Sequence, residues 1–92
     1  MKVIAIYDNG GKTADRYTFI IGGANAGIVT YPPGYGGGKR RQAIFMSDNC
    51  NMPNGVCMWG EVEVDSWDYL GEPISFVDLP EIVQRQIGKT IA

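Results

Sequence analysis

Short runs of β-forming residues, each ended by a glycine, a proline or a polar turn, make up the first two thirds of this sequence. They cover residues 3–7, 16–21, 28–31, 43–47 and 56–64. Asn9-Gly10 follows the first run, and this pair supplies the positive φ angles that tight hairpin turns require. The pattern predicts a small antiparallel β-sheet of about five strands.

The run at residues 56–64 is the most regular, and its alternation predicts which side chains share a side of the sheet. One side carries Val56, Met58, Gly60, Val62 and Val64, and the other carries Cys57, Trp59, Glu61 and Glu63. Successive side chains of a strand point to opposite sides, so the valine side is predicted to meet the core. The other side is predicted to meet water or a partner.

The hydrophobic period changes near the C-terminus, where the sequence predicts a helix. Asp78 and Glu81 have the spacing of a capping box, and Val77 with Ile82 has that of a hydrophobic staple. An apolar stripe follows, made of Leu79, Ile82, Val83 and Ile87. Gly88 is placed to end the helix.

These elements predict an α+β fold in a single domain, residues 1–92. A chain of this length has room for one core and buries only about 60–65% of the surface that its unfolded form exposes. We expect the C-terminal helix to pack on one face of the sheet.

The composition excludes several kinds of active site. The chain has no histidine, which removes His-dependent triads and every metal site that contains imidazole. Cys50 and Cys57 are too few for a four-ligand zinc site, and the residues near them are neutral or acidic. We expect reduced, structural thiols, because pairing the two would need an oxidising compartment. No metal and no cofactor are predicted.

The N-terminal segment lacks the features of a targeting signal. Its apolar run stops at Asp8, which is too short for the apolar region of a signal peptide. No other apolar run approaches the roughly 20 residues of a membrane span. The expected location is the cytoplasm, without membrane contact.

Three carboxylates offer the remaining route to catalysis. Glu61, Glu63 and Asp65 recur at every second position, which places neighbours roughly 6.5–7 Å apart along a strand. This separation lies within the range of some glycosidase carboxylate pairs. Alternating valine and glutamate is equally typical of a half-exposed strand, so we expect a protein that is not an enzyme.

The stretch PPGYGGGKRR, residues 32–41, combines glycines with three consecutive cations. It differs from a P-loop, because Gly34 and Gly38 enclose three residues instead of four and Arg40 stands where the hydroxyl residue belongs. A nucleoside triphosphatase is therefore rejected. The basic loop that remains, residues 34–41, has four candidates for contact with a phosphate, a nucleic acid or an acidic protein: Tyr35, Lys39, Arg40 and Arg41. A solvated hairpin tip is the alternative.

Aromatic and acidic side chains are interleaved over residues 59–69. The candidate partner-binding residues are Trp59, Glu61, Glu63, Asp65, Trp67, Asp68 and Tyr69. Tryptophan and tyrosine are enriched at binding hot spots, and carboxylates around them suit a basic partner. The alternative is that Trp67 and Tyr69 cover the edge of the core while the acids keep the surface soluble.

The net charge of −2 hides a division along the chain. Residues 1–46 carry six cations against two carboxylates, and residues 47–92 carry two cations against eight carboxylates. If the halves form different surfaces, the molecule has two charged poles that steer association. If they interleave as neighbouring strands, the charges neutralise one another.

Several short motifs resemble those of small accessory proteins encoded by tailed bacteriophages. They are residues 15–18 (DRYT), 46–49 (MSDN), Pro53 with Gly55, 59–61 (WGE), 70–71 (LG) with 74–76 (ISF), and 78–80 (DLP). The likeness does not cover residues 22–41. The resemblance implies a phage gene product that acts in the cytoplasm of a host bacterium, and it carries no activity to any residue.

Three functions remain as hypotheses. The first is a non-catalytic inhibitor of a bacterial defence system, anti-CRISPR-like, that binds a host defence protein or ribonucleoprotein complex through the acidic aromatic stretch. The second is a binding protein that sequesters a nucleotide signal through residues 34–41, for which a homo-oligomer is expected. The third is an accessory protein of phage morphogenesis or DNA metabolism.

Overall fold

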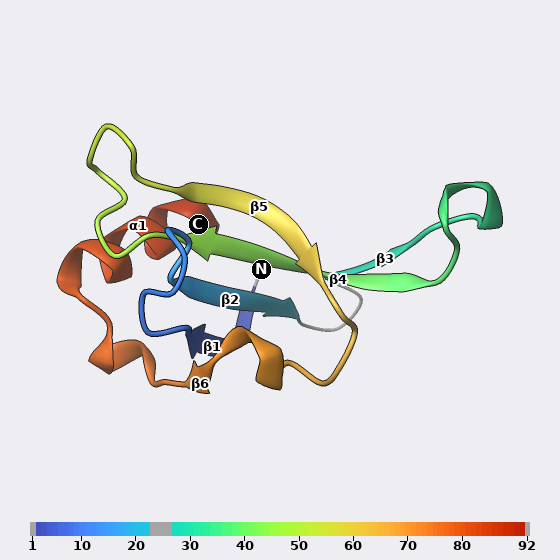
Figure 1. Cartoon of the computed structure of the whole chain (residues 1–92), viewed down its shortest axis with the longest axis horizontal. Helices are drawn as coiled ribbons and strands as arrows, with labels where there is room; N and C mark the ends of the chain where they lie inside the picture. The colour runs from blue at the N-terminus through green and yellow to red at the C-terminus, as the bar shows by residue number, and fades with distance from the viewer. Residues whose placement is uncertain (1, 23–26, 92) are drawn as a thin grey trace.

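The computed structural model of the chain describes residues 2–22 and 27–91 (Figure 1). The strands are β1 (Lys2–Asp8), β2 (Tyr17–Gly22), β3 (Ile28–Thr30), β4 (Lys39–Met46), β5 (Cys57–Val62) and β6 (Glu72–Pro73). The helices are α1 (Glu81–Ile91) and three 3₁₀ turns: η1 (Pro33–Tyr35), η2 (Asp68–Leu70) and η3 (Phe76–Asp78).

These strands form one antiparallel sheet. β4 pairs with β5 along one edge and with β2 and β3 along the other; β2 then pairs with β1, and β1 with β6. The sheet and the C-terminal helix confirm the predicted α+β fold. β6 is a strand that the sequence pattern did not show, because its two residues include a proline.

β3 and the start of β4 form a hairpin that projects from the rest of the sheet (Figure 1). β5 pairs with β4 only from Arg41 onward, so residues 28–40 extend beyond the end of β5. The longest dimension of the molecule is accordingly 39 Å, against 27 and 24 Å for the other two. We call residues 28–41 the arm and residues 32–38 the arm tip.

Both faces of the sheet are covered at β2, and all six residues of this strand are buried. Helix α1 packs on one face, where Val83 and Ile87 join the main core. A smaller core forms on the opposite face, where Trp67 and Leu70 of the segment after β5 pack against Ile20, Ala43 and Val62. Complete burial of one such aliphatic side chain stabilises the fold by roughly 1.5–3 kcal/mol, so the helix stripe fixes α1 on the sheet.

The start of α1 differs from the predicted capping box. The helix begins at Glu81, and Asp78 lies in η3, where its carboxylate makes no capping hydrogen bond within the described residues. The Gln84 side chain reaches back instead, and its Nε2 donates to the carbonyl oxygens of Phe76 at 3.2 Å and Leu79 at 3.0 Å. A polar side chain from inside the helix therefore satisfies carbonyls of the preceding turn.

Gly88 does not end the helix, which continues to Ile91. The added turn brings Ile91 against the main core beside Ile87, four residues earlier. Because residues at this spacing lie on the same side of a helix, packing on the sheet outweighs the weak helix propensity of glycine.

Three strand boundaries also differ from the prediction. β4 begins at Lys39 instead of residue 43, so the cations at residues 39–41 belong to a strand and not to a loop. β5 covers Cys57–Val62, shorter than the predicted 56–64. The connection between β1 and β2 covers residues 9–16, close to the predicted gap between the strands, and it contains the predicted turn at Asn9-Gly10.

Candidate functional site

The helix-facing side of β5 continues beyond the area that α1 covers, and it carries exposed aromatic and acidic groups. Trp59 lies opposite Ile44 in the strand register and is 43% exposed. Glu61, two residues further along β5, accepts a hydrogen bond from the hydroxyl of Tyr31 at the base of the arm. Glu63 forms an ion pair with Arg40 of β4 at 2.8 Å. We call the set Tyr31, Arg40, Trp59, Glu61 and Glu63 the β5 face.

Both carboxylates of the β5 face therefore already have partners. The hydrogen bond to Glu61 raises the pKa of the Tyr31 hydroxyl, which keeps the phenol protonated as a donor. An ion pair also joins Arg16 to Asp48 at 3.8 Å, so cations of the first half of the chain meet carboxylates of the second half at two places. This arrangement favours interleaved charges over two separate poles.

The rest of the predicted acidic aromatic stretch lies elsewhere. Trp67 is on the opposite face of the sheet, where its Nε1 donates to the Glu63 carbonyl oxygen at 2.7 Å and its ring packs edge-to-face on Tyr7 with centroids 6.5 Å apart. The exposed Tyr69 accepts a hydrogen bond from the Glu63 N–H at 3.3 Å. Asp65 and Asp68 are exposed. Trp59 and Glu61 thus lie on one side of the sheet, whereas the Trp67 ring packs on the other, although Trp67 and Tyr69 both bond to the Glu63 backbone.

The three cations of the predicted basic loop do not converge. They alternate along β4, so Lys39 and Arg41 point to one side of the strand and Arg40 to the other. Arg41 donates to the carbonyl oxygens of Ile21 at 3.1 Å and Val64 at 3.4 Å, and its guanidinium lies 5.9 Å from the centre of the Trp67 ring. Arg40 is held by Glu63 and Arg41 by two carbonyl oxygens, so among these three cations only the Lys39 side chain makes no ion pair or hydrogen bond within the described residues.

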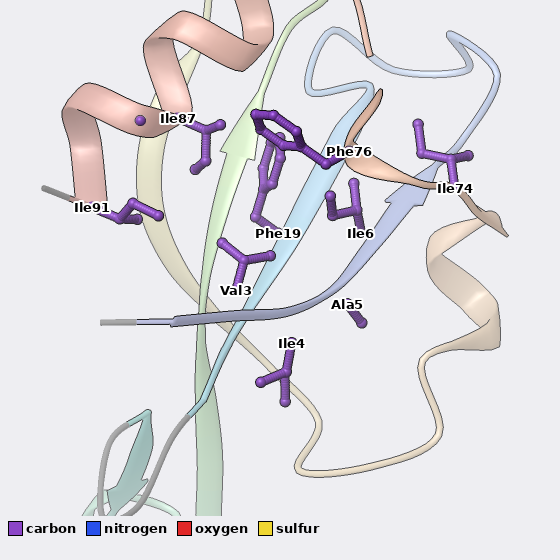
Figure 2. Close-up of a pocket in the computed structure, with 10 residues that line it drawn as sticks. Val3, Ile4, Ala5, Ile6, Phe19, Ile74, Phe76, Ile87 and Ile91 are labelled. Carbon is purple, nitrogen blue, oxygen red and sulfur yellow. The ribbon is translucent and has the colours of Figure 1, made fainter. Parts of the chain in front are cut away.

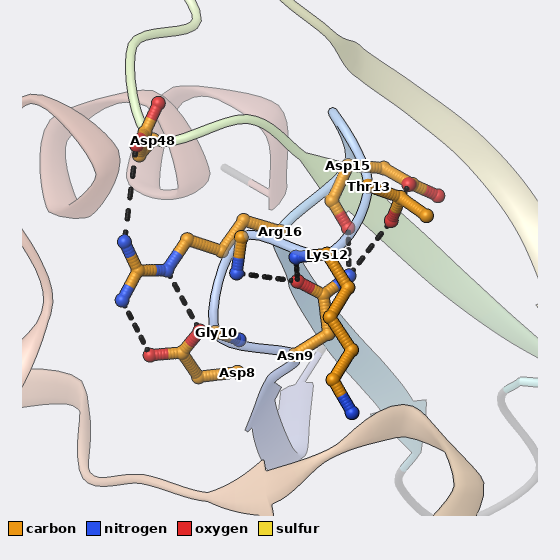
Figure 3. A network of polar contacts seen from close by, with 9 residues as sticks. Asp8, Asn9, Gly10, Lys12, Thr13, Asp15, Arg16 and Asp48 are labelled. Carbon is orange, nitrogen blue, oxygen red and sulfur yellow. Dashed lines mark hydrogen bonds and ion pairs between the residues drawn. The ribbon is translucent and has the colours of Figure 1, made fainter.

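A polar network that the sequence analysis did not identify holds the loop between β1 and β2 (Figure 3). Arg16 donates from Nε to Asp8 Oδ1 at 2.7 Å and from Nη2 to Asp8 Oδ2 at 3.0 Å. Asn9 Oδ1 accepts from the backbone N–H groups of Gly11 at 2.8 Å and Lys12 at 3.1 Å. The turn itself was predicted from Asn9-Gly10, and these hydrogen bonds add a second cause, because asparagine bonds readily to the backbone that follows it.

The electrostatics of this network are those of a structural contact. The hydrogen bond from Arg16 holds the pKa of Asp8 below its ordinary value, although partial burial opposes the shift. The same hydrogen bond raises the pKa of Arg16. Each charge stabilises the other, so neither group is prepared to exchange a proton near neutral pH.

An apolar groove of about 470 Å³ lies between β1, α1 and η3 (Figure 2). Its lining residues are Val3, Ile4, Ala5, Ile6, Phe19, Ile74, Phe76, Ile87, Gly88 and Ile91. Figure 2 shows Val3, Ile6 and Phe76 on the side that faces α1, with Ile87 and Ile91 projecting toward them from the helix. None of these side chains carries a hydrogen-bonding group, so the groove can hold an apolar group but offers no acid, base or nucleophile.

Cys50 and Cys57 are free thiols. Cys50 packs against the main core, and burial raises the pKa of its thiol, which makes it a weaker nucleophile near neutral pH. Cys57 is exposed, and its sulfur lies 3.6 Å from the Thr90 hydroxyl. Within residues 2–22 and 27–91, no three side chains of histidine, cysteine, aspartate or glutamate gather as a potential metal site.

No protein-family model, curated protein or solved structure matches the chain. In the part of the chain that the structure describes, no helix has both the length and the apolar character needed to cross a bilayer. Within the described residues, the β5 face places an exposed tryptophan, Trp59, beside charged neighbours.

Proposed function

We propose that this chain is a non-catalytic inhibitor that binds a partner protein through the β5 face. The partner class that we propose is a bacterial defence protein or ribonucleoprotein complex, so that the chain acts as a phage-encoded, anti-CRISPR-like protein in the cytoplasm of its host. The observation that carries the proposal is the exposed Trp59 ring on a strand whose neighbouring polar groups are already paired.

The paired charges favour binding on this surface. Burying an unpaired carboxylate in an interface is expensive, because the ion loses its water without a replacement. Glu61 keeps its hydrogen bond from Tyr31, and Glu63 keeps its ion pair with Arg40, when a partner covers them. Trp59 can then contribute its apolar area at a lower desolvation penalty, as expected of a hot-spot residue surrounded by polar groups.

The charges also indicate the chemistry of the partner. Glu61 has a neutral donor as its neighbour, so the β5 face keeps a negative charge that Arg40 does not neutralise. A basic surface complements it, and proteins that handle nucleic acids carry such surfaces to bind phosphates. This supports a nucleic-acid-handling defence complex as the partner.

The placement of the cations favours this proposal over nucleotide sequestration. A phosphate site needs several donors that point to one place. Arg40 and Arg41 are used within the chain and point to opposite sides of β4. Lys39 alone is too little for a nucleotide site.

The proposal is tested by capture of the partner on immobilised chain from bacteria that carry a defence complex, followed by affinity measurements with the captured complex. Trp59→Ala is expected to weaken binding by about 30-fold or more, as at other hot spots. The matched control is Met58→Ala, which truncates a side chain that is 54% exposed on the opposite side of the same strand. Equal affinities of the two variants would refute the β5 face as the binding surface.

A further inference from the structure

The arm is fixed to the body of the molecule at its base. The Tyr31 hydroxyl donates to Glu61, and Arg40 forms its ion pair with Glu63. The Arg41 side chain donates to the carbonyl oxygens of Ile21 in β2 at 3.1 Å and of Val64 after β5 at 3.4 Å. These contacts join the base of the arm to both neighbouring segments, so the direction in which the arm projects is set by the fold.

The arm tip is a closed turn and not an open glycine-rich loop. Pro32 accepts hydrogen bonds at its carbonyl oxygen from the N–H groups of Tyr35 at 2.9 Å and Gly37 at 3.0 Å, and the N–H of Tyr31 donates to Gly38 at 2.8 Å. The three glycines after Tyr35 all have positive φ angles, from 67° to 95°. Side chains other than glycine rarely adopt these angles, which explains the run of glycines as a conformational requirement.

Gly34 is the exception, because nothing among residues 2–22 and 27–91 requires a glycine there. Its φ is not positive, and a Cβ built on it would meet no atom within 4 Å. Its neighbours Pro32 and Pro33 are exposed, and Tyr35 is 81% exposed. A residue without a side chain between a proline pair and a tyrosine allows another surface to approach the backbone closely.

From these observations we infer that the arm tip is a preformed plug that inserts into a cleft of the partner protein, with Tyr35 as its anchor. This inference rests on the proposed function and adds the way in which the partner is blocked. The cleft that fits has apolar walls for the rings of Pro32 and Pro33, a hydrogen-bond acceptor at its end for the Tyr35 hydroxyl, and a carboxylate at its mouth for Lys39.

The shape and the order of the arm support insertion over contact with a flat surface. A two-stranded ribbon has strands about 4.8 Å apart, so the arm is narrow enough to enter an active-site cleft or a nucleic-acid channel. The turn is already closed before binding, so little conformational freedom is lost on insertion. Tyrosine adds a large contact area and a hydroxyl with few rotatable bonds.

The experiment places the photo-crosslinking residue p-benzoyl-L-phenylalanine at position 35 and, in a control chain, at position 77. Val77 is a matched control, because it is 78% exposed and lies in η3, far from the arm in the chain and in the fold. The two chains are irradiated in the same defence-bearing bacteria that are used for capture. We expect a discrete adduct from position 35 that protease removes and nuclease does not, and no such adduct from position 77.

Affinity for the captured complex supplies the second measurement. Tyr35→Ala is expected to lower the affinity about 30-fold or more, Gly34→Ala about tenfold, and Val77→Ala less than twofold. The melting temperatures of these variants should not change, because the three positions make few contacts within the chain. Capture that depends on Trp59 but not on Tyr35 would overturn the inference and leave the proposed function standing. A nuclease-sensitive adduct would overturn it in favour of nucleic acid, and failure of both capture and crosslinking would overturn both proposals.

Discussion

Replacing Asp8 with asparagine tests the polar network that shapes the loop between β1 and β2. The Asp8 carboxylate accepts two hydrogen bonds from Arg16, at 2.7 and 3.0 Å, and a third from the N–H of Gly10 at 2.8 Å. Its side chain is 19% exposed and that of Arg16 is 32% exposed. Asp8→Asn keeps the size of the group but removes its charge and turns one acceptor into a donor that faces a guanidinium.

The expected loss follows from this geometry. Hydrogen bonds to charged groups contribute about 1.5–3 kcal/mol when buried, and partial exposure reduces the value. We expect Asp8→Asn to lower the free energy of unfolding by about 1–2 kcal/mol. For a domain of this size, the melting temperature should fall by roughly 5–15 °C.

The loss should depend on pH with a defined sign. The pKa of Asp8 is lowered in the folded state, mainly by the hydrogen bond from Arg16. The stabilisation is therefore complete above the ordinary aspartate pKa of about 3.9, and it disappears as the pH falls through the lowered value. Asp8→Asn should cost the same at pH 6 and pH 8, and progressively less below about pH 4.

Urea denaturation of the wild type and the variant across this pH range provides the measurement. Asp65→Asn is the matched control, because Asp65 is exposed and makes no ion pair within the described residues. If Asp8→Asn unfolds like the wild type at pH 7, or if its deficit stays undiminished at the lowest pH at which the chain folds, the assignment of Asp8 and Arg16 as a stabilising pair is wrong.

Three further predictions concern the glycines and the thiols. Gly88→Ala should raise the free energy of unfolding by about 0.5–1 kcal/mol, since its methyl group meets no atom within 4 Å. A lower free energy of unfolding in urea denaturation would contradict the open space at this position. Gly71→Ala should lower it by about 1–3 kcal/mol, because φ is 117° and the new Cβ would lie 2.2 Å from the Asp8 carbonyl oxygen; an unchanged melting temperature would contradict this. Cys57 should react with a disulfide reagent before Cys50, because Cys57 is exposed and burial raises the pKa of Cys50; equal rates by mass spectrometry would argue against the packing of Cys50.

The parts of the fold that the sequence predicted are those with a strong local signal. The alternation at residues 56–64 correctly placed Val62 in a core and Trp59 and Glu61 on the other side of β5, but Met58, on the side predicted to meet the core, is 54% exposed. The apolar stripe of the C-terminal helix likewise predicted that Val83 and Ile87 are buried. Both signals are periodic, and a period survives small errors in the boundaries.

The errors arose where distant residues decide the structure. Residues 39–41 were predicted to be a loop because a run of three charged residues is not typical of a strand. In the structure, Arg40 pairs with Glu63 and Arg41 donates to the Val64 carbonyl oxygen, each more than 20 positions away. The ion pair between Arg16 and Asp8, which holds the loop after β1, likewise joins residues eight positions apart. Neither pairing leaves a signal in the local sequence.

The residues of the candidate site were predicted only in part, again because distant residues complete it. The alternation within β5 grouped Trp59, Glu61 and Glu63, but it could not show that Tyr31 and Arg40 come from the arm to complete the β5 face. Trp67 belongs to the same acidic aromatic stretch of the sequence as Trp59, and the chain turns before it at Ser66, whose φ is 64°. The segment after β5 thus carries Trp67 to the side of the sheet opposite Trp59.

The most direct test of the central claim, that the chain acts by binding a protein through the β5 face and the arm, is amide hydrogen exchange of the chain alone and bound to the captured complex. We expect slowed exchange at residues 57–63 and 31–38 and unchanged exchange at residues 9–16 and 81–91. Slowed exchange confined to β1 and α1, around the apolar groove, would contradict it.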